Sequence, residues 1–333
     1  MISLLLTLII LNFLIIFFFD KISFFLNLFD YPDQKRKLHL KPIAAVGGFI
    51  VFVNLSVFFL FFSLNNNYSY YILRYFSAQE FKIFYTFSII IFFTGYLDDK
   101  FKISANVKLI LHSILIYFLI IFSNNLLLKS INFSYFFGSV NILNISTFLT
   151  ILCFLLFINA FNMFDGINLQ AASYAIFIFI LFILNKIFIL LSIVIIIALL
   201  VFAFFNYKNK CFLGNSGSLL ISFIIAYLFI KSASYNNVFF ADQIFLIMAI
   251  PGFDLLRLAF QRILKHKHPF HADKNHIHHI LLFKFGLFKT LIILLGLIII
   301  PNILSFYLGY YFLFIFISLV FYLFLIYKYH YKA

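Results

Sequence analysis

Residues 187–206 read IFILLSIVIIIALLVFAFFN and contain no charged side chain. A helix needs about 20 mostly apolar residues to cross the hydrocarbon core of a bilayer, and this stretch has that length. Similar runs lie at 2–19, 46–64, 81–97, 107–123, 142–161, 170–184, 217–230, 238–255, 287–303 and 307–327. Because hydrocarbon offers no water to pair with backbone groups, each run is predicted to be a helix, although 170–184 and 217–230 are short. We therefore expect an all-α polytopic membrane protein with about 11 transmembrane helices.

The composition supports this class. Of the 333 residues, 65% are hydrophobic and 10% are charged, a balance that excludes a water-soluble globular domain. No repeat or linker divides the chain, so residues 1–333 are predicted to form a single domain, and the first run lacks the pattern of a cleaved signal peptide. Cys153 and Cys211 have no spacing that suggests a disulfide framework or metal site. The stretch 124–141 alternates loosely and is predicted to form a small extracytoplasmic hairpin.

The basic residues indicate the orientation, because cytoplasmic loops carry an excess of lysine and arginine. One side of the membrane receives the loops at 20–45, 98–106, 162–169, 207–216 and 256–286 and the C-terminal tail. Of the 24 basic residues, 19 lie on or beside this side. The other five are Arg74, Lys82, Lys129, Lys186 and Lys231. We expect this side to be cytoplasmic, with the N-terminus outside and the C-terminus inside. The net charge of +14 then implies no nucleic acid partner, although anionic headgroups or a phosphorylated substrate remain candidates.

The acidic residues lie on the same predicted face. Only Glu80 and Asp242 fall outside it, whereas the others are Asp20, Asp30, Asp33, Asp98, Asp99, Asp165, Asp254 and Asp273. No ionisable residue lies near the middle of a confident span, which argues against an ion-coupled transporter. We expect any chemistry to occur at the cytoplasmic surface.

The first polar motif is GYLDDKFKISANVKL, residues 95–109. Asp98 and Asp99 end the third span, where a helix C-terminus favours cations and disfavours anions. Adjacent carboxylates there suit Mg²⁺, which prefers oxygen ligands, water and phosphate oxygens. The alternative is a solvated helix end with Lys100 and Lys102 as counter-charges.

The second motif is NAFNMFDGINL, residues 159–169. Asn159, Asn162 and Asp165 recur every three residues, so on a helix they form one polar ribbon, and Gly166 permits the chain to turn. Amides placed in this way suit a sugar, a base or a phosphate, and Asp165 suits a metal or a hydroxyl. The alternative is a polar end that only terminates the helix.

The third motif is KHKHPFHADKNHIHHILL, residues 265–282, in the longest predicted cytoplasmic loop. Its clustered histidines and lysines favour binding of a pyrophosphate through N–H donors and positive charge. A zinc site is conceivable, but HExxH and cysteine ligands are absent. An exposed loop that is rich in histidine by chance is the alternative.

Two further segments are weaker when each is taken alone. In DYPDQKRKLHLKPIAAVGG, residues 30–48, basic side chains suit a lipid phosphate or serve as ordinary membrane anchors. In CFLGNSGSLL, residues 211–220, the backbone N–H groups of Gly214, Gly217 and Ser218 suit an anion at a helix start. Alternatively, Asn215 or Ser216 is a plain helix N-cap.

Together and in this order, the five segments resemble the polyprenyl-phosphate N-acetylhexosamine-1-phosphate transferases of glycosyltransferase family 4. The resemblance covers most of the chain. Matching positions are Asp98 and Asp99; Asn159, Asn162, Asp165, Gly166, Asn168 and Leu169; Arg36, Lys37, His39, Gly47 and Gly48; and HIHH at 276–279. The HIHH segment after PFHAD is similar to the WecA branch of the family rather than to the MraY branch.

This resemblance implies an activity in the bacterial inner membrane. A HexNAc 1-phosphate, most plausibly GlcNAc 1-phosphate, passes from a UDP-N-acetylhexosamine to polyprenyl phosphate, with Mg²⁺ or its substitute Mn²⁺, and UMP leaves. The product initiates lipid-linked glycan synthesis of the cell envelope, such as O-antigen. We consider membrane lipid as a further partner and a homodimer as the oligomeric state.

The resemblance also implies residue roles. It gives catalysis to Asp98, Asp99, Asp165 and Lys108. It gives substrate binding to Asn159, Asn162, Asn168, Arg36, Lys37, His39, Gly214, Ser216, Gly217, His276, His278 and His279. It gives metal binding to Asp98, Asp99, Asp165 and Asn215.

One position departs from the family pattern. Where most members have Gly-Asp-x-Gly-Ser, this chain has Asn215. An amide oxygen coordinates Mg²⁺ but carries no charge, so the third metal ligand is in question. A non-catalytic scaffold of the same fold and a flippase or transporter for an anionic lipid-linked substrate are the alternative functions.

Overall fold

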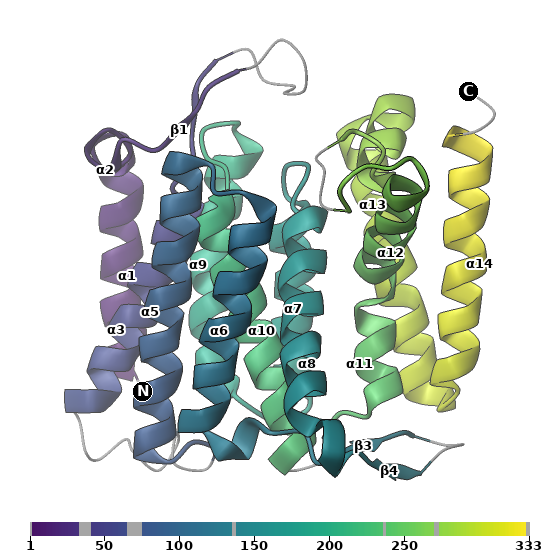
Figure 1. Cartoon of the computed structure of the whole chain (residues 1–333). Coiled ribbons are helices and arrows are strands. Elements are labelled where there is room, and N and C mark those ends of the chain that lie inside the picture. The colour runs from purple at the N-terminus through teal and green to yellow at the C-terminus, as the bar shows by residue number, and fades with distance from the viewer. Residues whose placement is uncertain are drawn as a thin grey trace. The chain divides into compact units, whose positions relative to one another are not determined.

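The computed structural model describes residues 2–32, 41–64, 75–134, 138–235, 238–269 and 273–330. Within these residues the regular structure is almost wholly helical (Figure 1). The α-helices are α1 (Ile2–Phe17), α2 (Phe19–Leu26), α3 (Gly47–Leu64), α5 (Ala78–Phe101), α6 (Ala105–Phe122), α7 (Ser146–Phe164), α8 (Gln170–Leu184), α9 (Ile189–Tyr207), α10 (Gly214–Tyr235), α11 (Ala241–Ile247), α12 (Ala249–Leu264), α13 (Ile277–Leu308) and α14 (Tyr311–His330). Short 3₁₀ turns lie at η2 (Asn124–Leu126) and η3 (Leu143–Ile145).

Every apolar run of the sequence lies on one or two of these helices. In the described part of the chain, 8 helices are long and apolar enough to cross a membrane, and counting two bent pairs as spans gives up to 10. Helix α8, the run at 170–184, is a shorter apolar helix. The chain is therefore an all-α, multi-pass membrane protein, as predicted, while the number of crossings and their orientation stay predictions.

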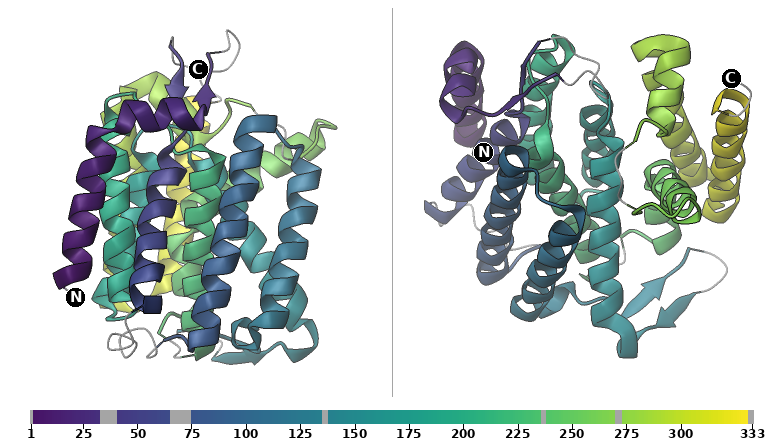
Figure 2. Two further views of the ribbon diagram at one scale, coloured as in Figure 1. Left: turned by 90° about the vertical axis from the view of Figure 1, so that its left-hand side faces the viewer. Right: turned by 45° about the horizontal axis from the view of Figure 1, so that its top comes forward.

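Two of the apolar runs bend sharply. Helices α1 and α2 meet at 75°, a turn that is visible in the left view of Figure 2. Helices α11 and α12 meet at 74°, so the run at 238–255 is not one continuous helix. Pro251 lies in the first turn of α12, where proline is tolerated because its missing N–H would have no helical partner. Helix α13 is also interrupted, at Gly286, whose φ of 73° is left-handed.

The predicted cytoplasmic loop at 256–286 is shorter than expected. Helix α12 continues to Leu264 and α13 begins at Ile277. The HIHH segment therefore forms the first turn of a helix and its N-cap, not the interior of a loop. Its backbone is helical at the histidines, because the His279 and Ile280 N–H groups both donate to the His276 carbonyl.

The chain divides into two compact units. The first unit comprises Met1–Leu115 and Ala172–Ile224, and the second comprises Ile116–Ala171 and Ile225–Ala333. The chain passes from one to the other within α6, at the start of α8 and within α10. That residues 1–333 form a single transferase domain stays a prediction.

In the first unit, α3 packs against α1, α5 and α9. Glycines bring the backbones of α3, α5 and α10 close together, since a Cβ at Gly48 would overlap the backbone of Gly217. A Cβ at Gly95 would lie 2.6 Å from the Asn215 carbonyl oxygen. Small residues permit such close crossings between helices in membranes. The Gly47-Gly48 pair of the sequence therefore has a packing reason.

The same unit holds a buried amide pair. Asn12 of α1 and Asn54 of α3 donate to each other's side-chain oxygens at 2.7 and 3.1 Å. Each amide also donates to a carbonyl one turn earlier on its own helix. Both side chains are buried, so this reciprocal pair ties α1 to α3 while leaving few amide groups unpaired.

Two short antiparallel strand pairs complete the fold. In the first unit, β1 (Phe29–Asp30) pairs with β2 (Ile43–Ala44), which the sequence analysis did not predict. In the second unit, β3 (Ser130–Asn132) pairs with β4 (Ser139–Asn141), and Ile131 lies opposite Val140. The hairpin predicted within 124–141 is therefore present, and Ser134 beside it donates to Asp242 in the first turn of α11. Which side of the membrane the hairpin lies on stays a prediction.

The helices of the second unit gather around α12. This helix packs against α7, α13 and α14, and α13 and α14 lie side by side (Figure 1). Residues from α12, α13 and α14 can therefore meet although they are far apart in the sequence.

Candidate active site

The first acidic residue of the Asp-Asp pair forms an ion pair across two helices. Asp98 lies in the last turn of α5 and is only 3% exposed. Lys108 of α6 places its Nζ 2.8 Å from Asp98 Oδ2. A cation beside a helix C-terminus offsets both the carboxylate and the helix dipole. The alternative interpretation named Lys100 and Lys102 as the counter-charges at this helix end. The structure shows Lys108 as the ion-pair partner of Asp98.

The second acidic residue caps another helix. Asp99 Oδ1 accepts the backbone N–H of Asn215 at 2.7 Å, and Oδ2 accepts that of Ser216 at 3.0 Å. These N–H groups belong to the first turn of α10, where helical donors lack partners within the helix. The N–H groups of Gly214, Gly217 and Ser218, which were expected to surround a bound anion, are not the ones that Asp99 accepts, so that expectation stays a prediction. The alternative interpretation was that the side chain of Asn215 or Ser216 caps α10. In the structure, the Asp99 carboxylate on α5 caps this helix.

Gly214 has a steric reason to be glycine. Its φ is +73°, and a Cβ there would lie 2.7 Å from Asp99 Oδ2. The preceding residues pair with the chain before α3, since Phe212 N–H donates to the Ala44 carbonyl and Gly48 N–H to that of Leu213. The backbone on both sides of Asn215 is thus fixed, and its half-buried side chain starts from a defined position.

In the second unit, the NAFNMFDGINL motif spans the end of α7. The helix ends at Phe164, and the Asp165 N–H still bonds to carbonyls of the last turn. The Asn159 amide donates to the Leu155 carbonyl at 2.7 Å, so one of its donors serves its own helix. Asn162, Asp165 and Asn168 are half-buried and complete the polar ribbon at this end.

Gly166 is required for packing rather than for a turn. A Cβ at this position would overlap the His278 imidazole, with Nε2 the nearest atom. The left-handed backbone in this segment falls at Leu169, with φ 66°. The predicted reason for a glycine at this position, that it permits the chain to turn, is therefore wrong. Glycine is needed at 166 because a side chain there would overlap His278. The Asp165–Leu169 segment and the HIHH segment lie in direct contact.

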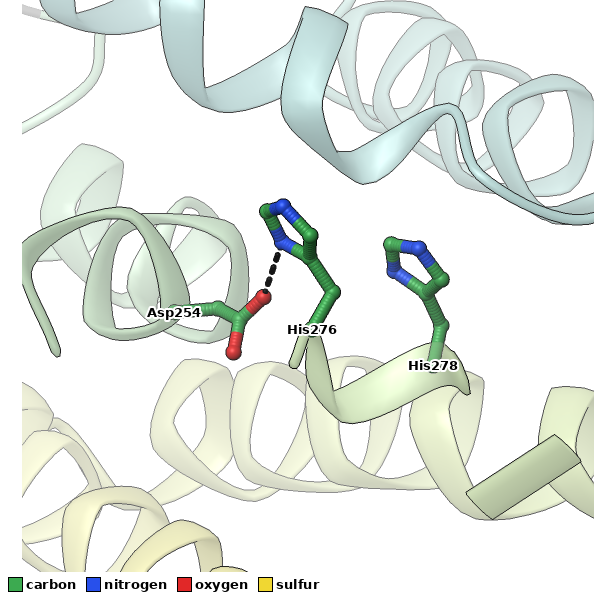
Figure 3. Close-up of side chains that lie close together, drawn as sticks. All are labelled: Asp254, His276 and His278. Carbon is green, nitrogen blue, oxygen red and sulfur yellow. Dashed lines mark hydrogen bonds and ion pairs between the residues drawn. The ribbon is translucent and has the colours of Figure 1, made fainter. Parts of the chain in front are cut away.

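Two histidines and a buried carboxylate lie together at the start of α13. His276 Nδ1 lies 2.8 Å from Asp254 Oδ2, and the His276 and His278 rings stack with centroids 5.2 Å apart and 9° between planes (Figure 3). His278 is 1% exposed, and its Nδ1 has no hydrogen-bond partner among the described residues. His279 is half-buried, with its ring edge toward that of His278 at 4.3 Å between centroids.

Arginine organises the loop before these histidines. Arg262 Nε donates to Asp273 at 2.9 Å, and Nη1 donates to the Pro269 carbonyl at 2.7 Å. Partial burial alone would raise the pKa of Asp273, but the hydrogen bonds from Arg262 and from the Asn275 N–H hold it below its usual value of 3.8. Asp273 therefore stays ionised at neutral pH and keeps the loop attached to α12.

The histidine cluster fits a metal by residue type but not by charge. Suitable ligand atoms of Asp254, His276 and His278 lie within 4.8 Å of one another. However, Asp254 is already paired with Arg257 at 2.8 Å, and Arg262 Nη2 lies 3.5 Å from His276 Nε2. A divalent cation placed beside two guanidinium groups would be repelled by both. We therefore interpret the cluster as a hydrogen-bonded ion-pair network.

Magnesium suits a different set of groups. Mg²⁺ takes carboxylate and amide oxygens together with water and phosphate oxygens. Asp98, Asp99 and Asn215 offer such oxygens in the first unit, and Asp165 does so in the second. Asp99 uses one lone pair of each oxygen for α10, which leaves acceptor capacity on both. By donor chemistry these residues fit the ion.

The predicted site residues are thus only partly placed. Arg36, Lys37 and His39 lie outside the described residues. Sequence reasoning missed Asp254, Arg257, Arg262 and Tyr322 as parts of the histidine network. The spacing of Asp254 and Arg257 by three residues was a usable signal, because residues three apart on a helix face each other.

Comparisons with known proteins match most of the chain. The profile of glycosyl transferase family 4 matches residues 81–233, which include Asp98, Asp99, Asp165 and Asn215. Three relatives carry the name undecaprenyl-phosphate alpha-N-acetylglucosaminyl 1-phosphate transferase. The protein of Thermotoga maritima is 27% identical over 87% of this chain and 85% of its own length. The protein of Escherichia coli strain K12 is 26% identical over 81% of this chain and 73% of its own length. The protein of Salmonella typhi is 25% identical over 80% of this chain and 72% of its own length. The chain is therefore similar to glycosyl transferase family 4 over residues 81–233 and, over most of its length, to relatives named undecaprenyl-phosphate alpha-N-acetylglucosaminyl 1-phosphate transferase.

Proposed function

We propose that this protein transfers N-acetylglucosamine 1-phosphate from UDP-N-acetylglucosamine to undecaprenyl phosphate and releases UMP. The carrying observation is that relatives named for this transfer match along 79% to 87% of the chain. The reaction would occur at the cytoplasmic face of a bacterial inner membrane and begin the synthesis of a lipid-linked envelope glycan. The comparisons favour this enzyme over the transporter and scaffold alternatives.

The transfer requires two anions to approach each other. A phosphate oxygen of the lipid attacks the β-phosphorus of the nucleotide sugar, the bond to the bridging oxygen breaks, and UMP departs with that oxygen. Catalysis of such a step consists mainly of positioning and charge neutralisation. The second pKa of a phosphomonoester is near 6, so the lipid phosphate is largely a dianion at neutral pH and needs no strong base.

Lys108 is a partly exposed cation of the first unit that could assist the transfer. Its ammonium has three donors, of which Asp98 accepts one at 2.8 Å. The side chain is 30% exposed, so the remaining donors can reach a phosphate oxygen. Asp98 holds the ammonium in place, and Asp98, Asp99 and Asn215 would supply oxygen ligands to Mg²⁺ or Mn²⁺, whose charge lowers the cost of bringing the two phosphates together. Asp165 stays a predicted ligand.

In the second unit, the histidine segment at the start of α13 would bind the donor's diphosphate. His278 presents Nε2 to the Asp165–Leu169 segment, and Lys274 is exposed beside the start of α13. Uncharged imidazole donates one N–H bond, and lysine adds positive charge, which together suit a diphosphate. The half-buried amides of Asn162 and Asn168 would orient the nucleotide or the sugar.

The deciding experiment is a donor screen with purified protein. The protein is mixed with undecaprenyl phosphate, Mg²⁺ and a panel of radiolabelled UDP-N-acetylhexosamines, and both lipid-diphospho-sugar and UMP are measured. We expect product with UDP-GlcNAc. Absence of product with every donor, while an active relative works in the same detergent, would contradict the proposal and favour a scaffold.

Asn215 provides a sharper test of the metal assignment. In Asn215→Asp the new carboxylate adds a charged ligand, so we expect activity to be kept or raised and the Mg²⁺ concentration for half-maximal rate to fall. Loss of activity in this variant would show that the amide has a role of its own.

A homodimer stays a prediction, which light scattering of the purified protein tests.

A further inference from the structure

Asp254 is a buried carboxylate of the second unit that is hydrogen-bonded to four other residues. Its Oδ1 accepts from Arg257 Nη2 at 2.8 Å, from the Tyr322 hydroxyl at 2.8 Å and from the Ile277 N–H at 3.2 Å. Its Oδ2 faces His276 Nδ1 at 2.8 Å. The carboxylate is 3% exposed, so these donors replace the water it has lost. One group on α12 thereby joins the start of α13 to the last helix, α14.

The network fixes the His276 ring. A guanidinium can only donate, so His276 Nε2, 3.5 Å from Arg262 Nη2, acts as the acceptor and the ring proton lies on Nδ1. That proton is donated to Asp254. A carboxylate paired with a histidine in this way sets both the tautomer and the orientation of the imidazole. Because His278 stacks on His276, the plane of one ring restricts that of the other.

Tyr322 and Arg257 in turn hold Asp254. Arg257 Nε donates to the Tyr322 hydroxyl at 2.6 Å while the hydroxyl donates to Asp254, so the three groups form a closed ring of hydrogen bonds. Arg257 also donates to the Asn275 carbonyl at 2.6 Å, directly before the histidines. The charges of Asp254 and Asp273 balance those of Arg257 and Arg262, so the network is complete without a metal ion.

We propose that Tyr322 and Arg257 are positioning residues that act through Asp254 to fix His276, so that the stacked His278 keeps the orientation that binds the donor substrate. The last helix thus supports the candidate active site through one hydroxyl group. What the histidines bind rests on the proposed function, whereas the anchoring itself does not.

The first test is Tyr322→Phe, which removes the hydroxyl but keeps the ring beside Phe253. Asp254 loses one donor and Arg257 loses one acceptor. Because hydrogen bonds to charged groups are among the stronger ones, we expect the KM for UDP-GlcNAc to rise about ten- to hundredfold. The KM for undecaprenyl phosphate should stay within about twofold. A merely structural role would reduce the amount of active protein and leave both KM values unchanged, which would overturn the proposal.

Matched variants control for the chemical change. Tyr307→Phe removes a hydroxyl from an exposed tyrosine of α13 and should leave both KM values unaltered. Arg257→Lys keeps the positive charge but loses the planar fork that serves several acceptors at once, so it should raise the donor KM as Tyr322→Phe does. A donor KM in Arg257→Lys equal to that of wild type would contradict the proposal.

The second test needs no substrate. Hydrogen exchange followed by mass spectrometry reports on residues 273–280, where the Ile277 N–H bonds to Asp254. Exchange there should be faster in Tyr322→Phe than in wild type and unchanged in Tyr307→Phe. Equal exchange in all three proteins overturns the anchoring whether or not the protein is active. Faster exchange in Tyr322→Phe, together with no turnover by the wild-type protein, would leave the anchoring intact and refute only the proposed function. Bound zinc that disappears in His276→Ala would overturn the proposal in favour of a metal site.

Discussion

Replacing Asp99 with alanine removes the carboxylate that caps α10. Two backbone N–H groups, those of Asn215 and Ser216, lose acceptors at 2.7 and 3.0 Å. A hydrogen bond to a charged group contributes about 1.5–3 kcal/mol. Asp99 is half-buried, so water can partly replace it, and we use the lower part of that range for each bond. The expected loss is about 3–4 kcal/mol in the free energy of unfolding.

Thermal unfolding in detergent, followed by circular dichroism, measures this loss. The midpoint should fall by about 5–15 °C, since 1 kcal/mol corresponds to about 2–4 °C in a domain of this size. Asp99→Asn keeps one neutral acceptor and should lie between alanine and wild type. Asp20→Ala removes an exposed carboxylate from the first turn of α2 and should cost at most about 1 kcal/mol.

The activity of the same variants separates two roles for Asp99. If Asp99→Ala unfolds at the wild-type midpoint and yet is inactive, the capping argument is refuted and Asp99 acts directly on a substrate or a metal. If both the midpoint and the activity fall, and Asp99→Asn recovers part of each, the carboxylate works by placing Asn215 and the turn that carries it.

Two other substitutions test the packing. Gly166→Ala should displace His278 and lower activity in the transferase assay at least about tenfold, and a fully active variant would contradict the contact. As a control on α12, Gly252→Ala adds a Cβ that meets no atom within 4 Å. It should stabilise the protein by about 0.5–1 kcal/mol, which thermal unfolding measures. Asn12→Leu should lower the free energy of unfolding by about 0.6–2 kcal/mol, because Asn54 loses its partner. The double variant Asn12→Leu with Asn54→Leu should lose less stability than the sum of the two single variants. Additive losses would contradict the pairing.

Local sequence signals predicted the helices and some of their ends. The motif Ser77-x-x-Glu80 before α5 forms a capping box, with bonds of 3.1 and 2.9 Å between each side chain and the other's backbone N–H. This signal is readable from the sequence alone. The breaks at Phe18 and Met248 were not predicted, because an apolar run does not reveal whether its helix is straight. The break at Gly286 lies at the end of the predicted loop at 256–286, directly before the apolar run at 287–303.

The site residues divide in the same way. Residue types placed Asp98, Asp165 and the histidines among candidates for phosphate and metal chemistry. Their partners could not be predicted, because a hydrogen bond between distant residues depends on packing. Tyr322, 68 residues from Asp254, looks in the sequence like any aromatic residue of a membrane helix.

The sequence by itself therefore determined the membrane class, the helical content and the chemical character of the motifs. These properties depend on hydropathy over about 20 neighbouring residues and on side-chain type, both of which are local. The tertiary structure decided what each polar group does. Asp99 caps a helix that begins more than a hundred residues later, Gly166 makes room for His278, and Tyr322 supports a histidine through Asp254. The physical reason is that a buried polar group must find its hydrogen-bond partner in space, and only the packing of the helices determines which partner that is.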